Sequence, residues 1–404
     1  MTTLTDPPQE SFRLSMLLND TRYRSYTFQF IALIGVFLFI GWLISNAAQN
    51  LEDLGQDISF GFLGEAAGYD INQRPIEYNS QDTHLRASIV GVLNTLIVAF
   101  LGCITATVFG VIAGILRLSN NWIVARLMAV YVEAFRNVPV LIWILIIFFI
   151  MTASLPAPRA FRGDEPAATM LFDAFAFTNR GVYAPKPIWE AGSMIVVITF
   201  LLSVAGIFAY RRYATKLLYD TGRLLPTFWP SVALFFVPTI LMYFIMGRPI
   251  SLEYPEMSGF NFTGGMQVRG SLIALWFALA IYTGAFIAEN VRAGILAISK
   301  GQTEAAASLG LRPNRIMNLV ILPQALRVII PPLISQYLNL TKNSSLAIAV
   351  GYMDVTGTLG GITLNQTGRA IEAILLLMLF YLTISLAISA IMNVYNNAVK
   401  LKER

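Results

Sequence analysis

The sequence predicts an all-α integral membrane protein with about eight transmembrane helices. Its 404 residues are 56% hydrophobic and only 13% charged, and the mean hydropathy is +0.64. A soluble domain of this length cannot bury so much apolar surface. Several uncharged runs also reach the roughly 20 residues that a helix needs to cross a bilayer core about 30 Å thick.

The apolar runs give the position of each span in turn. We expect helices at about 28–47, 87–116, 127–152, 191–210, 227–246, 269–298, 324–343 and 370–396. Arg13, Arg22 and Arg24 precede the first run, and no small-residue cleavage site follows it. The first helix is therefore expected to be retained and not to be a removed signal peptide.

The basic residues predict the orientation of these spans. With a cytoplasmic N-terminus formed by residues 1–27, seventeen Lys and Arg residues fall on the cytoplasmic side and ten on the other. The positive-inside rule therefore favours a multi-pass protein with both termini in the cytoplasm. The same residues are spread over short loops, so the basic pI near 9.3 does not indicate nucleic-acid binding.

The residue types exclude several chemistries. The chain has one cysteine, Cys103, and one histidine, His84, so neither a disulfide framework nor a metal cluster is expected. A phosphate-binding P-loop requires Gly-Lys followed by Ser or Thr, and the chain contains no Gly-Lys pair. We therefore expect no enzymatic activity and no cofactor in this chain.

A polar segment, residues 300–323, separates the sixth and seventh spans on the cytoplasmic side. Residues 301–309 are good helix formers, and Gly310 is placed to end that helix in the left-handed conformation. The run from Arg312 to Arg315 predicts a second short helix, because proline favours a first helical turn. Pro323 marks the return into the bilayer. The segment is thus expected to form a helix-turn-helix that projects from the membrane.

This segment resembles the loop by which permease subunits of bacterial ABC importers bind their ATPase. The resemblance rests on Glu304, Ala305 and Ala306, on Gly310, and on Pro323 after a hydrophobic run. Two longer blocks resemble the polar amino acid permeases within that family. The first includes Glu133-x-Phe-Arg-x-x-Pro-x-Leu141, and the second runs from about residue 271 to the C-terminus.

The resemblance implies an architecture. The smallest members of the family have five helices, which form the type I importer core. Here residues 87–152 and 269–404 match that core, residues 28–86 add a first helix and a periplasmic loop, and residues 153–268 insert periplasmic loops and a helix pair. This layout is similar to that of the long permeases of general L-amino acid transport systems.

The resemblance also implies function and partners. The chain is expected to be the inner-membrane permease of an ATP-driven importer of polar L-amino acids. Its apolar helices are expected to be in contact with the lipid bilayer. It would work with a homologous second permease, two ATPase subunits that bind ATP and Mg²⁺, and a periplasmic amino acid-binding protein. The residues expected to contact the ATPase are Glu304, Ala305, Ala306, Gly310, Arg312 and Pro323.

Ionisable residues inside the membrane are costly and are candidates for function. Arg136 is expected near mid-bilayer, because it follows Arg126 by about ten residues, or roughly 15 Å of helix rise. A guanidinium there could bind an α-carboxylate with two hydrogen bonds. It could equally pair with Glu133 one turn earlier. Glu289 could hold a substrate ammonium or pair with Arg292. The polar residues Asn94 and Lys342 are further substrate candidates, facing either a cavity or a helix interface.

Two proline sites predict irregular helices. Pro139 follows Arg136, and Pro331-Pro332 is expected to interrupt the seventh span and free backbone carbonyls. Such sites line transport paths or merely kink helices. The alternative function, an ion-coupled secondary transporter, would need a carboxylate relay and internal repeats. The sequence shows neither.

Overall fold

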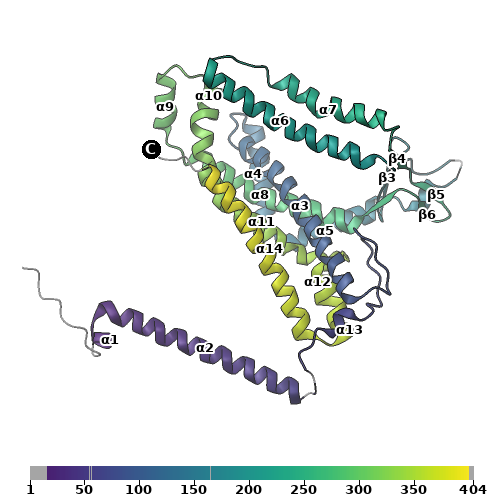
Figure 1. Cartoon of the computed structure of the whole chain (residues 1–404), viewed down its shortest axis with the longest axis vertical. Coiled ribbons are helices and arrows are strands. Elements are labelled where there is room, and N and C mark those ends of the chain that lie inside the picture. The colour runs from purple at the N-terminus through teal and green to yellow at the C-terminus, as the bar shows by residue number, and fades with distance from the viewer. Residues whose placement is uncertain (1–15, 54, 56, 164, 400–404) are drawn as a thin grey trace, which may run out of the picture. The chain divides into compact units, whose positions relative to one another are not determined.

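The computed structural model describes residues 16–53, 55, 57–163 and 165–399 (Figure 1). The chain divides into two compact units, one up to Phe62 and one from Leu63 onward. The first holds α1 (Met16–Asn19) and α2 (Thr21–Asp53), which is apolar on all sides. Arg13 and the C-terminal basic residues Lys400, Lys402 and Arg404, which contribute to the predicted orientation, lie outside the described residues.

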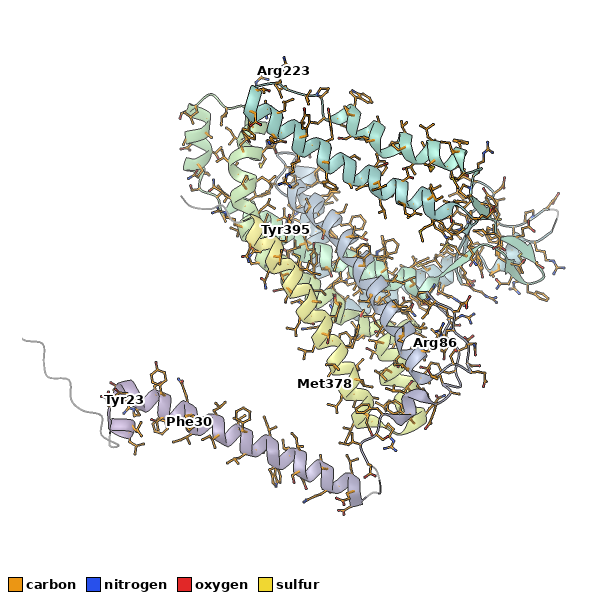
Figure 2. All side chains as sticks on the ribbon, in the orientation of Figure 1. Tyr23, Phe30, Arg86, Arg223, Met378 and Tyr395 are labelled. Atoms are coloured by element: carbon orange, nitrogen blue, oxygen red, sulfur yellow. The ribbon has the colours of Figure 1, made fainter. Side chains whose placement is uncertain are left out.

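Eight helices in the described part of the chain are long and apolar enough to cross a membrane, which confirms the predicted fold class. After α2 they include α3 (His84–Leu116), α5 (Val140–Ser154), α6 (Ser193–Thr221), α7 (Phe228–Ile245), α8 (Gly270–Leu296), α11 (Leu322–Asn343) and α14 (Ala370–Val399). α14 packs against α11, and some of its side chains, such as Met378, are left exposed (Figure 2).

The span predicted over 127–152 is wrong as a single helix, whereas the irregularity predicted at Pro139 is confirmed. The chain forms α4 (Trp122–Asn137), breaks at Val138, and resumes as α5. Pro139 has no backbone N–H to donate, and its ring forces the preceding residue out of the helical region. Val138 accordingly has φ −115° and ψ 135°. Phe135 and Trp143 stack across the break, with ring centroids 4.1 Å apart.

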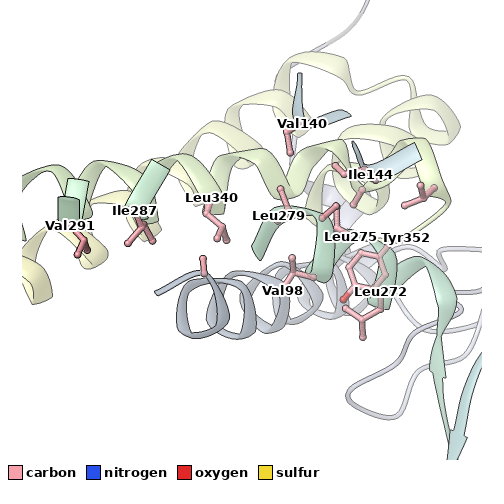
Figure 3. Close-up of a cluster of buried hydrophobic side chains, with 14 of the residues drawn as sticks. Val98, Val140, Ile144, Leu272, Leu275, Leu279, Ile287, Val291, Leu340 and Tyr352 are labelled. Carbon is pink, nitrogen blue, oxygen red and sulfur yellow. The ribbon is translucent and has the colours of Figure 1, made fainter. Parts of the chain in front are cut away.

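The core of the second unit is the contact between α3 and α8, which bury more residues than any other described helix. Small residues on α3 allow the two backbones to come close. A Cβ at Gly110 would lie 2.5 Å from Ile287, and one at Gly114 would lie 2.7 Å from the carbonyl oxygen of Ala288. Figure 3 shows the side chains of this cluster, which Val140 and Ile144 of α5 and Leu340 of α11 complete.

The expected interruption at Pro331-Pro332 is also wrong, because α11 continues through both prolines. The helix is continuous with the preceding elements as well: α10 (Pro313–Ile316) leads through the π-helical segment η3 (Met317–Ile321) into α11. A single helical segment therefore runs from Pro313 to Val350, ending in the 3₁₀ segment η4 (Ser344–Val350).

The inserted region contains short antiparallel strands that the sequence did not predict. β1 (Ala176–Thr178), β2 (Gly181–Ala184) and β7 (Met266–Arg269) form one sheet in that order. β3 (Lys186–Trp189) pairs with β4 (Ile250–Glu253), and β5 (Glu256–Ser258) pairs with β6 (Asn261–Thr263). The segments before α6 and after α7 are thus joined by backbone hydrogen bonds.

Candidate functional site

The polar segment after α8 folds as a helical hairpin. α9 (Lys300–Ser308) ends at Gly310, whose φ of +75° is left-handed, and α10 then turns back with Pro313 in its first turn. The N–H of Gly310 donates to the carbonyl of Ala307 at 2.9 Å, which satisfies a free carbonyl at the helix end. The predicted helix, cap and second helix are therefore present.

The hairpin presents most of its side chains outward. Glu304, Ala305 and Arg312 are exposed, whereas Ala306 faces inward and is buried. Leu309, beside the turn, is 80% exposed. Pro323 lies in the first turn of α11, where the chain re-enters the apolar region.

A cluster of charged side chains lies near the same ends of α3, α4 and α8. Glu289 of α8 contacts Arg117, the residue that ends α3, and its carboxylate also lies 3.1 Å from Arg292 and 3.7 Å from Arg136 of α4. Arg117 is only 12% exposed and Glu289 26% exposed. The carboxylate of Glu289 thus lies beside three guanidinium groups and links the helices that carry them, α3, α4 and α8.

This geometry bears on the sequence-based interpretation of these residues. Arg136 pairs with Glu289, not with Glu133; Glu133 instead lies 4.0 Å from Arg117. The mid-bilayer position expected for Arg136 rested on its distance along the helix from Arg126, and both residues do lie on α4. Glu289 lies seven residues before the end of α8, about 10 Å of helix rise, and Arg136 reaches that level. The expected pairing of Glu289 with Arg292 is confirmed.

Arg136 keeps donor groups available within this cluster. Its side chain is 37% exposed, and its guanidinium carbon lies 5.4 Å from the ring centroid of Phe286. Such a contact holds the planar group in place by a cation–π attraction. Tyr131, two residues before Glu133, donates a hydrogen bond to the carbonyl of Ile281 and so fixes α4 on α8. Arg136 is therefore a positioned guanidinium with an accessible edge.

Asn94 lies in a packed interface and not in a cavity. Its side chain is fully buried, and its amide nitrogen donates to the carbonyls of Gln73 and Met353 at 2.9 and 2.8 Å. The backbone carbonyl of Asn94 accepts from the hydroxyl of Tyr352. Asn94 thus connects α3 to two loops, the one that contains Gln73 and the one that contains Met353. Lys342, in contrast, is exposed near the end of α11.

Sequence reasoning missed two residues. Arg117 was treated only as a topological marker, although a basic residue directly after an apolar run could have signalled a helix-end partner. Asp354, between η4 and α12 (Val355–Gly357), is fully buried. Its Oδ1 accepts from the backbone N–H of Gly357, while its Oδ2 has no hydrogen-bond partner in the described part of the chain. Burial raises the pKa of Asp354 to about 7.

The raised pKa of Asp354 gives a pH prediction. An unfolded aspartate has a pKa near 3.9, so between about pH 4 and pH 7 the folded state binds more protons than the unfolded state. The free energy of unfolding should therefore fall as the pH rises through this window, by on the order of 4 kcal/mol, and then level off. The measurement is thermal unfolding of the purified protein between pH 4 and pH 8. Asp354→Asn should flatten the curve; an unchanged slope in that variant would contradict the assignment.

Comparison with known proteins identifies the family. Residues 203–401 match the family model described as the binding-protein-dependent transport system inner membrane component. The chain is 53% identical to the glutamate/glutamine/aspartate/asparagine transport system permease protein BztB of Rhodobacter capsulatus, with 100% of both chains covered. The chain belongs to the permease subunits of amino acid ABC importers. This permease is also 42% identical to the general L-amino acid transport system permease protein AapQ of Rhizobium johnstonii, covering 98% of this chain and 96% of that one.

The family membership decides between the two functions that the sequence left open. It identifies a multi-pass inner-membrane permease of an ABC importer and does not support an ion-coupled secondary transporter. Among solved structures, the permease is similar to a chain of an amino acid ABC transporter crystallised with histidines, at 19% identity and a TM-score of 0.45. That alignment covers 78% of this chain and 95% of the other.

Proposed function

We propose that this permease forms the translocation path of an importer that moves polar L-amino acids into the cytoplasm. The substrate class is supported by the names of the full-length relatives, which refer to glutamate, glutamine, aspartate and asparagine or to L-amino acids in general. The observation that carries the proposal is the exposed hairpin formed by α9, Gly310 and α10. An element of this kind gives an external ATPase a point of attachment to the membrane helices.

The family implies an ATPase and a binding protein as partners, and we propose a full assembly around this chain. Two ATPase subunits would bind ATP and Mg²⁺ and hydrolyse the nucleotide, so the permease itself is not an enzyme and holds no cofactor. A periplasmic binding protein would deliver the amino acid. A homologous and shorter permease would complete a heterodimer, because the inserted region between α5 and α8 gives this chain elements that a minimal permease does not need.

We propose that both termini face the cytoplasm and that the type I core consists of residues 87–152 and 269–404. The distribution of basic residues supports this orientation. Figure 1 shows α9 and α10 at the same end of the second unit as the turn between α6 and α7. Of the proposed coupling residues, Glu304, Ala305, Gly310 and Arg312 would then be exposed to the ATPase, whereas Ala306 and Pro323 would support the hairpin from within.

We propose Arg136 as the residue that binds the substrate carboxylate, with Glu133 and Glu289 beside it. Its cation–π contact orients the guanidinium while leaving an edge accessible, which suits the two-bond recognition of a carboxylate. Glu133 is exposed and could accept from a substrate ammonium. Asn94 would act on the path indirectly, by holding loops against α3, and the exposed ammonium of Lys342 would act near the outer end of α11.

The test of the Arg136 assignment is amino acid uptake in reconstituted vesicles. Arg136→Lys keeps the positive charge next to Glu289 but loses the planar two-bond geometry, so uptake should fall at least tenfold while thermal stability stays near wild type. Arg292→Lys is the matched control, because it makes the same change in the same cluster, and its uptake should be close to normal. Normal uptake by the Arg136→Lys variant would leave Arg136 as a structural partner of Glu289 only.

A further inference from the structure

The inserted helices α6 and α7 pack against each other and make no extensive contact with another helix in the described part of the chain. α6 buries only Ser193, Val196, Ser203 and Ala214, and α7 buries only Ser231. By comparison, most of the surface of α8 is covered by its neighbours. Within this subunit the α6–α7 hairpin is therefore surrounded mainly by lipid.

Four basic side chains gather where this hairpin turns. Arg211, Arg212 and Lys216 lie on the last turns of α6, and Arg223 directly follows the helix; we call these four residues the basic turn. All four are exposed, and none lies within 4.0 Å of a carboxylate among the residues that the structure describes. Figure 2 shows Arg223 at the extreme end of the hairpin.

The lengths of the two helices place Arg211 and Arg212 at the depth of the lipid headgroups, with Lys216 and Arg223 farther from the hydrocarbon. The 18 residues of α6 from 193 to 210 carry no charge, and neither do the 18 residues of α7. Eighteen helical residues span about 27 Å, close to the thickness of the hydrocarbon core. The first basic residue, Arg211, thus lies where the hydrocarbon ends, whichever way the protein is oriented.

One hydrogen bond and a set of exposed aromatic side chains fit this position. The Nε atom of Arg211 donates to the hydroxyl of Ser231 at 3.4 Å, which directs one guanidinium toward the junction of the two helices. Exposed aromatic side chains flank the basic turn: Tyr213 and Tyr219 on α6 and Trp229 on α7 are 58%, 84% and 72% exposed. Tyrosine and tryptophan favour the interface between hydrocarbon and water.

We propose that the basic turn binds the phosphate headgroups of anionic phospholipids. Three guanidinium groups and one ammonium without carboxylate partners offer many donors, and guanidinium binds phosphate oxygens with paired hydrogen bonds. Clustered basic residues next to a membrane helix each strengthen binding to an anionic lipid surface roughly fivefold. Because α6 and α7 lie apart from the α3–α8 core, this site is separate from the proposed substrate path.

The experiment is a titration of the purified importer complex in mild detergent with headgroup-labelled phosphatidylglycerol. The variant Arg211→Gln/Arg212→Gln/Lys216→Gln should weaken binding at least tenfold, and binding of phosphatidylcholine should be weak and unchanged. The matched control is Arg159→Gln/Arg162→Gln/Lys186→Gln, which removes three exposed charges from the segment between α5 and α6. That control should bind phosphatidylglycerol like the wild type.

Three results would overturn the proposal. They are wild-type binding by the α6 triple variant, an equal loss in the control, and displacement of the lipid by millimolar inorganic phosphate, which would indicate a site for soluble anions. If the α6 triple variant does not assemble, Arg212→Gln and Lys216→Gln are measured singly. Each should weaken binding about threefold, and unchanged binding in both would also reject the site.

Discussion

Replacing Gly310 with valine is expected to reduce amino acid uptake at least tenfold while the permease still inserts into the membrane. Gly310 has a φ of +75°, and a β-branched residue in that conformation costs about 1–2 kcal/mol or more. A Cβ at this position would meet no atom within 4 Å, so the effect would come from the backbone alone and not from a clash. The turn would reopen, and α10 would leave the position in which we propose that it contacts the ATPase.

Gly301→Val is the matched control for this change. Gly301 lies inside α9, has an ordinary backbone conformation, and also has no atom within 4 Å of an added Cβ. Uptake by this variant in reconstituted vesicles, with ATPase subunits bound, should stay near wild type. Normal uptake by Gly310→Val, or equal loss by both variants, would show that the left-handed turn is not needed for coupling.

Removing the charge of Glu289 is the second change with a large expected effect. Glu289→Gln would leave the guanidinium groups of Arg117, Arg292 and Arg136 without their shared carboxylate. Breaking a largely buried ion pair costs about 3 kcal/mol, because the remaining charge stays desolvated. We expect the unfolding temperature to fall by several degrees and uptake to fall with it, as α4 loses its tie to α3 and α8.

Glu133→Gln separates this effect from a general loss of negative charge. The Glu133 side chain is 61% exposed and only reaches 4.0 Å from Arg117, so its pair contributes little to stability. Thermal unfolding of both variants in the same detergent provides the comparison. A Glu289→Gln protein as stable as the wild type, or no more affected than Glu133→Gln, would mean that the cluster does not hold the three helices together.

The sequence alone predicted those elements that depend on a local pattern of residues. Apolar runs long enough to cross a bilayer identified the helices, because a membrane span must satisfy its own backbone hydrogen bonds and shield them with apolar side chains. The position of Gly310 predicted the cap for a similar reason, since few residues other than glycine adopt a left-handed conformation at a helix end.

The predictions that were wrong concern features that depend on residues distant in the sequence or on competing local effects. Of the two proline sites expected to make a helix irregular, Pro139 does separate α4 from α5, whereas Pro331 and Pro332 remain inside a helix that its surroundings hold together. The charges nearest in sequence to Arg136 suggested a pair with Glu133, but the three-dimensional packing of α4 on α8 brings Glu289 closer. Two of the strand pairs, β2 with β7 and β3 with β4, join segments separated by the whole α6–α7 hairpin, which no local pattern reports.

The helical segment from Pro313 to Val350 has a mechanical consequence. Its 38 residues form a rod about 57 Å long that begins in the hairpin and ends beside the buried loop around Asp354. A rod transmits displacement along its axis with little loss, except where its hydrogen-bond ladder is irregular. Here that occurs in the π-helical turn at 317–321 and at the two prolines, which lack N–H donors. Together with the 3₁₀ end at 344–350, these places are where the segment bends most readily, and they set how much of a displacement at one end arrives at the other.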